Sequence, residues 1–337
     1  MQPTDIKLSA LERDFINSFQ GNFPLQEQPF LAIAERLGCY EDELITTVKD
    51  LKEKKLLTRF GPLYDAARLG GGLTLAAISA PEDSFDSVTE QVNTYAEVAH
   101  NYRREHELNM WFVLATETPD EITQVIASIE KTTGLSVYNF PKLQEFYIGL
   151  WLHLSADGNN TTVPVPGMSE DHIEIGDNHT LDDIDRKLIS ATQSGLAIEK
   201  TPYQKIADDI GISQDEVLQR LKLLLSCGII RRIGAVPNHY KLGFTANGMT
   251  VWDVDDDKIT ELGNIIGQLD FVSHCYQRPR HLPMWRYNLF AMVHGGNKDE
   301  VNKKVKQIEK LLGDNCRAHE TLFSSAILKK TGLRLAA

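Results

Sequence analysis

Residues 29–38 of this chain read PFLAIAERLG, and residues 202–211 read PYQKIADDIG. Proline, isoleucine, alanine and glycine recur at matching places, 173 positions apart (202 − 29). The same offset relates Leu51 to Leu224. A repeat of this period indicates that the chain of 337 residues consists of two related copies of one unit.

Each copy is expected to begin with three short amphipathic helices. In the first copy, apolar residues recur three or four positions apart within residues 8–19, 30–37 and 44–51, a spacing typical of helices with one buried face. Gly38 and Gly211 fall between the second and third helices, where a helix-turn-helix often needs a left-handed residue. A β-rich stretch follows each third helix, which predicts a wing.

The rest of each copy alternates strand and helix in the order β-α-β-β-α-β, the ferredoxin-like arrangement. In the first copy, strands are expected near residues 73–78, 98–102, 110–115 and 146–150, and helices near residues 85–95 and 119–131. The second copy repeats this pattern near residues 249–252, 259–266, 272–276, 287–293 and 301–312. The predicted fold class is therefore α+β, a tandem duplication of a winged helix-turn-helix plus a ferredoxin-like domain.

Domain boundaries follow from the repeat. We predict helix-turn-helix domains at residues 1–62 and 181–236, ferredoxin-like domains at residues 63–154 and 237–337, and a linker at residues 155–180. The linker is rich in Asp, Asn, Gly, Thr and Pro and has no apolar period.

The charge argues against nucleic-acid binding, and the cysteines argue against a cysteine-bound metal site. The net charge is −12, from 35 Lys and Arg against 47 Asp and Glu, so the average surface repels nucleic acid. The four cysteines are scattered, without the spacing of a zinc or iron–sulfur site. No targeting segment or apolar run of membrane-spanning length is evident, so we expect a cytoplasmic protein with no membrane partner.

Two short segments in each ferredoxin-like region carry side chains suited to chemistry. The first copy has HNYRR at residues 100–104 and NMW at residues 109–111; the second has HCYQR at residues 274–278 and NLF at residues 288–290. Residues two apart in a strand share a face, so an imidazole, a phenol and a guanidinium would line one wall in each copy.

The helix-turn-helix followed by a ferredoxin-like domain resembles the Lrp/AsnC superfamily. The H-x-Y-x-R and N-(L/M)-(W/F) segments, and RRIGAVPNH at residues 231–239, resemble the siroheme decarboxylases of that superfamily. The duplication resembles their fused two-subunit form, which is associated with heme d1 biosynthesis, although the alternative heme pathway remains open.

This resemblance implies removal of the carboxyl groups of the C12 and C18 acetates of siroheme, giving 12,18-didecarboxysiroheme and carbon dioxide. It implies no added cofactor, since the substrate siroheme supplies the iron. It also implies an intramolecular pseudo-dimer with a pocket near the interface of the halves. A further homodimer, or association with related decarboxylase subunits, stays open.

Siroheme carries eight carboxylates and an iron, so its pocket needs guanidinium groups and has a use for a neutral imidazole. The expected catalytic residues are His100, His274, Tyr102 and Tyr276. The histidines would deliver a proton or, alternatively, ligate the siroheme iron; the tyrosines would orient the substrate or donate a second proton.

Further candidates for substrate binding are arginines, second imidazoles and two residues of the strand motif. They are Arg103, Arg104, Arg231, Arg232, Arg278, Arg280, His106, His281, Trp111 and Asn288. Core packing is the competing interpretation of Trp111, and His239, His294 and His319 have no motif support. Because arginines gather near the second motif, including Arg286, we expect catalysis in the second half.

A transcriptional regulator and a non-catalytic tetrapyrrole-binding protein are the alternatives. The helices expected to read DNA begin CYEDE at residues 39–43 and SQDE at residues 213–216, which places carboxylates where phosphates would approach. These acidic turns argue against DNA binding, although they also suit a helix N-terminus.

Overall fold

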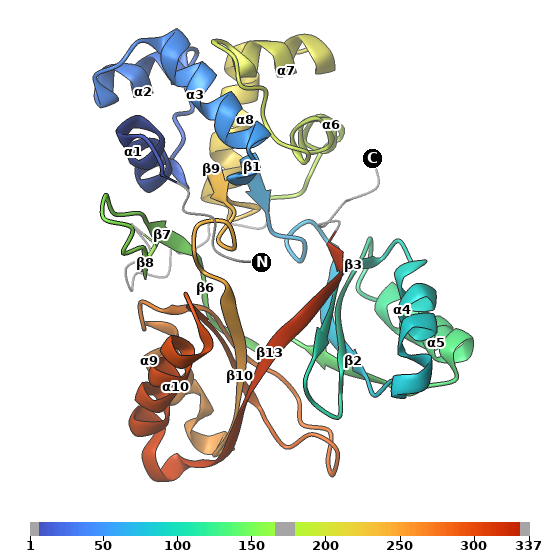
Figure 1. The fold of residues 1–337 in the computed structure, drawn as a ribbon. Coiled ribbons are helices and arrows are strands. Elements are labelled where there is room, and N and C mark those ends of the chain that lie inside the picture. The colour runs from blue at the N-terminus through green and yellow to red at the C-terminus, as the bar shows by residue number, and fades with distance from the viewer. Residues whose placement is uncertain (1–6, 166–178, 331–337) are drawn as a thin grey trace.

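The structure is a computed structural model that describes residues 7–165 and 179–330. It consists of a layer of helices above two sheets, and each sheet carries a pair of helices on its outer side (Figure 1). Within the described residues, no helix combines the length and apolar character needed to cross a bilayer.

The two helix-turn-helix units have the predicted helices and share one hydrophobic core. The helices are α1 (Ala10–Phe19), α2 (Pro29–Leu37) and α3 (Glu41–Glu53) in the first copy, and α6 (Asp183–Thr192), α7 (Pro202–Ile210) and α8 (Gln214–Ser226) in the second. Gly38 and Gly211 end α2 and α7 at φ values of 70° and 77°, which confirms the predicted left-handed turns.

The two wings pair with each other. Strands β1 (Leu57–Tyr64) and β9 (Ile230–Pro237) form an antiparallel ribbon in which Gly61 lies opposite Gly234. These two glycines occupy matching positions in the two copies, so β1 and β9 pair symmetrically about this point. The chain at Gly234 passes so close to α1 that an added Cβ would lie 2.4 Å from the Phe19 carbonyl oxygen.

Both ferredoxin-like units are present, which confirms the predicted α+β fold class and tandem duplication. The first contains β2 (Gly72–Ile78), α4 (Phe85–Asn93), β3 (Val98–Arg104), β4 (Met110–Thr116), α5 (Glu121–Thr133) and β5 (Val137–Pro141). The second contains β10 (Ala246–Val254), α9 (Ile259–Gly267), β11 (Val272–Gln277), β12 (Leu289–Gly295), α10 (Lys298–Leu312) and β13 (Cys316–Lys330). Short 3-10 turns lie at Glu82–Ser84, Asp256–Lys258 and Gly313–Asn315.

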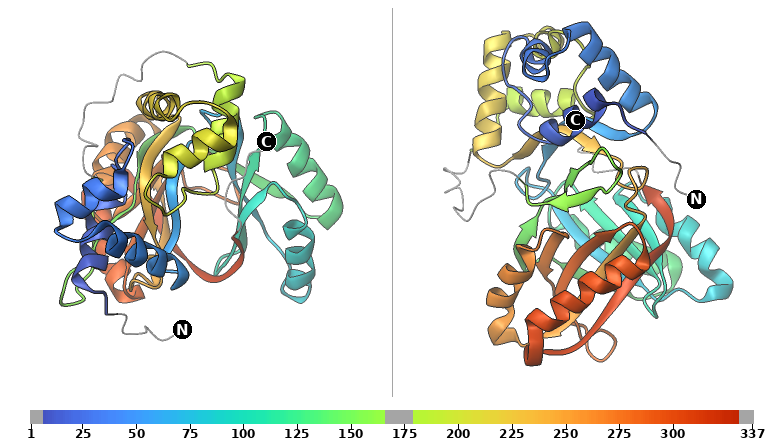
Figure 2. Two further views of the ribbon diagram at one scale, coloured as in Figure 1. Left: turned by 90° about the horizontal axis from the view of Figure 1, so that it is seen from above. Right: turned by 60° about the vertical axis from the view of Figure 1, so that its left-hand side comes forward.

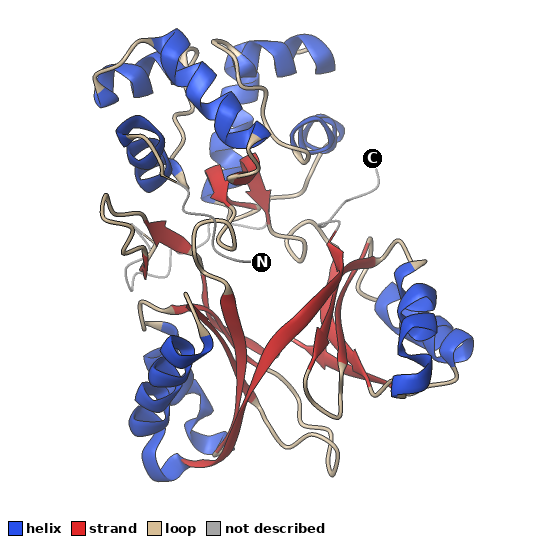
Figure 3. Ribbon diagram, in the orientation of Figure 1, coloured by secondary structure: helices blue, strands red, loops and turns tan. Residues whose placement is uncertain are grey.

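The fourth strand of each unit continues into the sheet of the other unit. The strand order is β5-β2-β4-β3-β13-β10-β12-β11-β6. β13 pairs with β10 over its first half and with β3 over its second half, and β6 (Gln144–Ile148), which follows β5, pairs with β11. The two sheets are therefore joined at both ends. Figure 2 shows the molecule from two other directions, and Figure 3 shows its strands in red.

Two sequence-based boundaries differ from the structure. The last strand of the first unit was expected near residues 146–150, but its own sheet is completed by β5, and residues 144–148 serve the second unit as β6. Within the expected linker, Thr161–Val163 forms β8, which pairs with β7 (Trp151–His153). Residues 166–178 of that linker lie outside the described part of the chain.

Aromatic side chains fill the space between the inner faces of the two sheets. Trp111 stacks on Phe140 with ring centroids 5.1 Å apart and lies 5.0 Å from Trp285. Trp111 and Trp285 are fully buried. Core packing is thus the observed role of Trp111, and the halves are held together by apolar burial as well as by strand pairing.

We expect Gly234→Ala to destabilise the chain by about 1–3 kcal/mol, because its Cβ would overlap the backbone of α1. Gly296→Ala is the matched control, since its nearest non-neighbouring atom is a flexible Glu300 oxygen at 3.4 Å. Thermal unfolding of both variants measures the difference. A Gly234→Ala protein as stable as the control would contradict the close crossing of the wings.

Candidate active site

The motif histidine follows a β-bulge in both copies. On β3 the pairing with β4 shifts register between Val98 and His100, and on β11 the pairing with β12 shifts between Val272 and His274. A bulge re-aims neighbouring side chains and is common beside active sites. The same irregularity at the same place shows that the two histidines are structural equivalents.

The motif side chains lie on the inner faces of β3 and β11. Asn101 donates from Nδ2 to Asn93 of α4 at 3.1 Å, and Cys275 lies against the Gly263 carbonyl of α9, so these two residues point towards the helices. Because neighbouring residues point to opposite faces, the His, Tyr and Arg of each motif point inward. These residues are His100, Tyr102 and Arg104 on β3, His274 and Tyr276 on β11, and Arg278 directly after β11.

Each motif arginine is held by a backbone carbonyl of the other half. Arg104 donates from Nη1 to the Leu322 carbonyl of β13, and Arg278 donates from Nη1 to the Phe140 carbonyl of β5. Each cluster therefore contains backbone from both copies. This arrangement agrees with the expected pseudo-dimer and places the clusters where the halves meet.

Neither motif guanidinium is neutralised by a carboxylate. Among residues 7–165 and 179–330, Arg104 and Arg278 form no ion pair, and the Nε atom of each is buried without a hydrogen-bond partner. Burial lowers the pKa of both guanidinium groups to about 10. A buried charge without a counter-charge is costly, so both sites are suited to an anionic ligand.

The ribbon of β1 and β9 contributes two further guanidinium groups, those of Arg59 and Arg232, which occupy matching positions in the two copies. Arg232 donates from Nη1 to the Leu150 carbonyl at 3.2 Å, and Arg59 has Nε and Nη2 buried without a partner in the described structure. Burial lowers the pKa of both groups. The sequence motifs did not single out Arg59, although its repeat match with Arg232 was the available signal.

His100 is a neutral imidazole at neutral pH. Its ring centroid lies 6.3 Å from that of Tyr102, and its Nδ1 atom is buried without a hydrogen-bond partner in the described part of the chain. Burial, and then the charge of Lys330 opposite it on β13, lower the pKa of His100 to about 4. Burial and nearby Tyr240 raise the pKa of the Tyr102 phenol, which therefore keeps its proton.

His274 also lies beside its motif tyrosine, with more positive charge around it than His100 has. Its ring centroid lies 6.0 Å from that of Tyr276. Burial, and then the charges of Arg231, Arg278 and Arg232, lower the pKa of His274 to about 4. Burial also raises the pKa of the Tyr276 phenol. Each cluster thus offers a neutral imidazole, a protonated phenol and a guanidinium.

Arg231 lies near the second cluster but is partly neutralised. Its Nη2 atom lies 2.7 Å from Oδ2 of Asp65. Burial raises the pKa of the Asp65 carboxyl group, but the charge of Arg231 and hydrogen bonds lower it below its ordinary value. The Nη1 atom of Arg231 remains buried without a partner among the residues that the structure describes. Arg231 can therefore contribute one free donor face to a ligand.

Arg103 and Arg280 do not join the clusters. Arg103 points to the helix side of β3, where it lies 2.6 Å from Oε2 of Glu82 and stacks over Phe85. Arg280 lies in the loop after β11 and pairs with Asp253 at 2.9 Å. Strand alternation accounts for the position of Arg103, and the loop carries Arg280 beyond the strand.

The expected cationic surplus of the second half is smaller than the sequence suggests. Arg280, Arg286 and Arg317 all bind Asp253. Despite burial, which acts in the opposite direction, their hydrogen bonds lower the pKa of that carboxyl group to about 2. Arg280 and Arg286 are therefore ion-paired outside the clusters, whereas Arg278 and Arg232 have no ion pair within the described residues.

His106, His281 and Asn288 have structural partners elsewhere. His106 packs 5.3 Å from Trp285 and accepts at Nδ1 from the Leu108 amide, and Nε2 of His281 lies 2.7 Å from the Asn139 carbonyl. Asn288 binds both backbone groups of Val254. Asn109 binds Ala80 in the same way in the first copy, so the motif asparagine ties two strand ends together.

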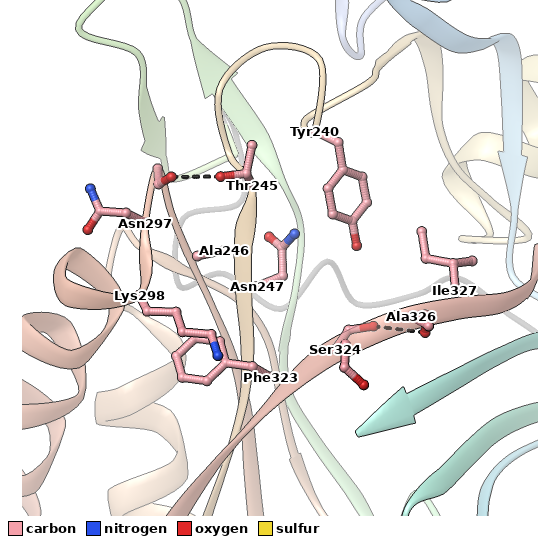
Figure 4. Close-up of a pocket in the computed structure, with 12 residues that line it drawn as sticks. Tyr240, Thr245, Ala246, Asn247, Asn297, Lys298, Phe323, Ser324, Ala326 and Ile327 are labelled. Atoms are coloured by element: carbon pink, nitrogen blue, oxygen red, sulfur yellow. Dashed lines mark hydrogen bonds between the residues drawn. The ribbon is translucent and has the colours of Figure 1, made fainter. Parts of the chain in front are cut away.

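A pocket of about 340 Å³ opens between β10, the start of α10 and the middle of β13. Its lining includes Tyr240, Asn247, Lys298, Phe323 and Ile327, and none of the predicted site residues (Figure 4). Ile327 is the register partner of Tyr102, so the pocket borders the first cluster along β13.

Two histidines without motif support also lie in this region. The His239 ring lies 4.2 Å from that of Tyr240 and 5.7 Å from that of His294. Burial lowers the pKa of His239 to about 4 and that of His294 well below its ordinary value. The copies differ here, since Ala115 occupies the place of His294 in the first unit.

Comparison with known proteins matches both parts of each copy. An AsnC-like ligand binding domain matches residues 68–147 and 241–329, and a siroheme decarboxylase NirDL-like HTH domain matches residues 12–57 and 185–231. A siroheme decarboxylase of Hydrogenobacter thermophilus is 30% identical over 321 residues, covering 94% of this chain and 92% of that protein.

Two further similarities bear on the site. A siroheme decarboxylase NirH subunit of Pseudomonas aeruginosa is 59% identical over 151 residues, which is 45% of this chain and 88% of that subunit. A crystal structure of the siroheme decarboxylase NirDL with an iron-uroporphyrin III analogue has a TM-score of 0.69 and 27% identity, covering 96% of this chain and 92% of that one.

The two imidazoles make the stability of the ligand-free protein depend on pH. Burial lowers the folded-state pKa of His100 and His274 to about 4, below the ordinary value of about 6.5. Their contribution is therefore fully present above about pH 6.5 and is lost as the pH falls towards 4. We expect Tm to fall over this interval and the double variant His100→Gln/His274→Gln to show a shallower fall.

Thermal unfolding at a series of pH values measures this slope. His153→Gln, at an exposed histidine, is the control and should retain the wild-type slope. An unchanged slope in the double variant would rule out the two neutral, buried imidazoles.

Proposed function

We propose a function for this chain from one premise, that it belongs to the siroheme decarboxylase family. We infer that it is a carboxy-lyase that removes the carboxyl groups of the C12 and C18 acetates of siroheme. The products would be 12,18-didecarboxysiroheme and carbon dioxide, and the place of the reaction would be heme d1 biosynthesis.

The observation that carries the proposal is a set of buried or half-buried guanidinium groups without carboxylate partners. They are Arg59, Arg104, Arg232 and Arg278. A chain with 47 acidic residues leaves these four groups without an ion pair in its described part. Siroheme, with eight carboxylates, supplies counter-charges of the kind that these groups lack.

The arginines are better suited to the carboxylates that remain than to those that leave. Loss of carbon dioxide transfers an electron pair from the carboxylate to the methylene carbon and the ring, and one proton is consumed for each acetate. A guanidinium stabilises the carboxylate charge of the substrate more than the charge-depleted transition state. We therefore assign the reacting acetates to the neutral imidazole and phenol, and the other carboxylates to arginine.

The phenols are the protein's proton donors at neutral pH. Burial raises the pKa of Tyr102 and Tyr276, so both carry a proton, whereas the lowered pKa of His100 and His274 leaves each imidazole with a lone pair. The imidazoles can then take up a proton or ligate the siroheme iron. The proposal needs no cofactor other than the substrate's own iron.

We propose the joined halves as the working unit, since each cluster takes a backbone carbonyl from the opposite copy. Association with further decarboxylase subunits, or with a second copy, and a cytoplasmic location stay predictions. A DNA-binding regulator is less well supported, because α3 begins with Glu41, Asp42 and Glu43.

Anaerobic incubation of the purified full chain with siroheme, followed by mass spectrometry of the extracted tetrapyrrole, tests the function. We expect the loss of two carbon dioxides per siroheme. Loss of one would restrict the proposal to a single acetate and point to a missing partner subunit. Bound but unchanged siroheme would support a carrier, and no binding would overturn the proposal.

A further inference from the structure

A chain of hydrogen bonds leads from β10 to His274. The Oδ1 atom of Asn247 lies 2.5 Å from Nδ1 of His294, and Nε2 of His294 lies 2.5 Å from Oγ of Ser273. The same Ser273 hydroxyl lies 2.7 Å from Nδ1 of His274. Asn247, His294 and Ser273 are all buried. The bulge before His274 lets Ser273 reach both rings.

The direction of each bond in this chain follows from its first member. Asn247 donates from Nδ2 to the Phe244 carbonyl, so its Oδ1 atom is the one that accepts from His294. His294 therefore carries its proton on Nδ1, and since burial keeps this ring neutral, its Nε2 is an acceptor. The Ser273 hydroxyl must donate to that nitrogen.

The last link determines the tautomer of His274. Ser273 has one hydroxyl proton, and it is used towards His294, so its oxygen can only accept from Nδ1 of His274. His274 is then protonated on Nδ1 and has its lone pair on Nε2. Hydrogen-bond partners set histidine tautomers in this way in metal sites and catalytic triads.

The first copy has no equivalent of this chain. By strand register, Ala99, Ala115 and Leu73 occupy the places of Ser273, His294 and Asn247. Alanine and leucine side chains cannot form these hydrogen bonds. In agreement, Nδ1 of His100 is buried without a partner among residues 7–165 and 179–330, so no side chain in that part of the chain selects between its two tautomers.

We propose that Asn247, His294 and Ser273 are positioning residues that hold His274 as the Nδ1-protonated tautomer, with the Nε2 lone pair available to siroheme. The inference deepens the proposed function, on which it rests for its substrate. It assigns the proton-accepting or iron-binding imidazole to the second half. It also gives the duplication a division of labour, because His100 lacks the same support.

Nitrogen-15 NMR of the full chain with labelled histidine tests the tautomer directly. The signal of His274 is identified by its loss in His274→Gln. We expect a protonated Nδ1 and an unprotonated Nε2 in the wild type at neutral pH, without any substrate present. A His274 protonated on Nε2 would overturn the proposal, whatever the enzyme does with siroheme.

Variants of Ser273 connect the tautomer to turnover. Ser273→Ala introduces the residue that the first copy already carries, so the strand accommodates it. We expect kcat to fall about 10- to 100-fold, with KM little changed and with mixed tautomers of His274 in the NMR spectrum. Ser273→Thr retains the hydroxyl and should restore both.

Ala99→Ser is the matched control, because it adds a hydroxyl at the same position of the other copy; it should leave the His274 tautomer unchanged. Full kcat and a single Nδ1-protonated form in Ser273→Ala would show that the hydrogen-bond chain has no positioning role. A wild-type protein inactive on siroheme but with the expected tautomer would refute the proposed function alone.

Discussion

The pairing of β13 with both β10 and β3 is the constraint on which the rest of the structure depends. One strand of 15 residues completes the second sheet and then extends the first, and β5 followed by β6 makes the reciprocal connection. Because of this exchange, each four-stranded sheet gains one strand from the other copy. The carbonyls that bind Arg104 and Arg278 each belong to the opposite copy, so the two clusters form only when the halves are joined.

Electrostatics explains how an acidic chain can bind a polyanion. The net charge of −12 describes the average surface, whereas the clusters hold guanidinium groups that no described carboxylate neutralises. By contrast, Arg103, Arg231 and Arg280 each have an acidic partner. Selective omission of acidic residues, rather than an excess of basic ones, makes the site attractive to carboxylates. The destabilisation caused by these unpaired guanidinium groups is confined to the clusters, where a bound carboxylate can offset it.

The repeat made most of the fold predictable, because apolar periodicity and turn glycines report local structure. Contacts between the two copies were harder to predict from the sequence. Residues 144–148 look like the end of the first unit, and only the three-dimensional pairing assigns them to β11. At the site, strand alternation correctly grouped His, Tyr and Arg, whereas Arg280 required knowledge of a loop. His294 was passed over because its partners, Ser273 and Asn247, come from two other strands.

The central claim is that the guanidinium groups of Arg104 and Arg278 have no carboxylate partner in the described protein and bind carboxylates of the substrate. The most direct test is the Tm of Arg104→Met/Arg278→Met with and without siroheme, beside Arg103→Met, which loses an outer ion pair and the stacking over Phe85 but no contact in the clusters. We predict that the ligand-free double variant is about as stable as the wild type, since each lost hydrogen bond is offset by removal of a buried charge. Siroheme should raise Tm in the wild type and in Arg103→Met but not in the double variant. A ligand-free double variant destabilised by about 3–5 kcal/mol, as expected for breaking a buried ion pair, or one still stabilised by siroheme, would contradict the account.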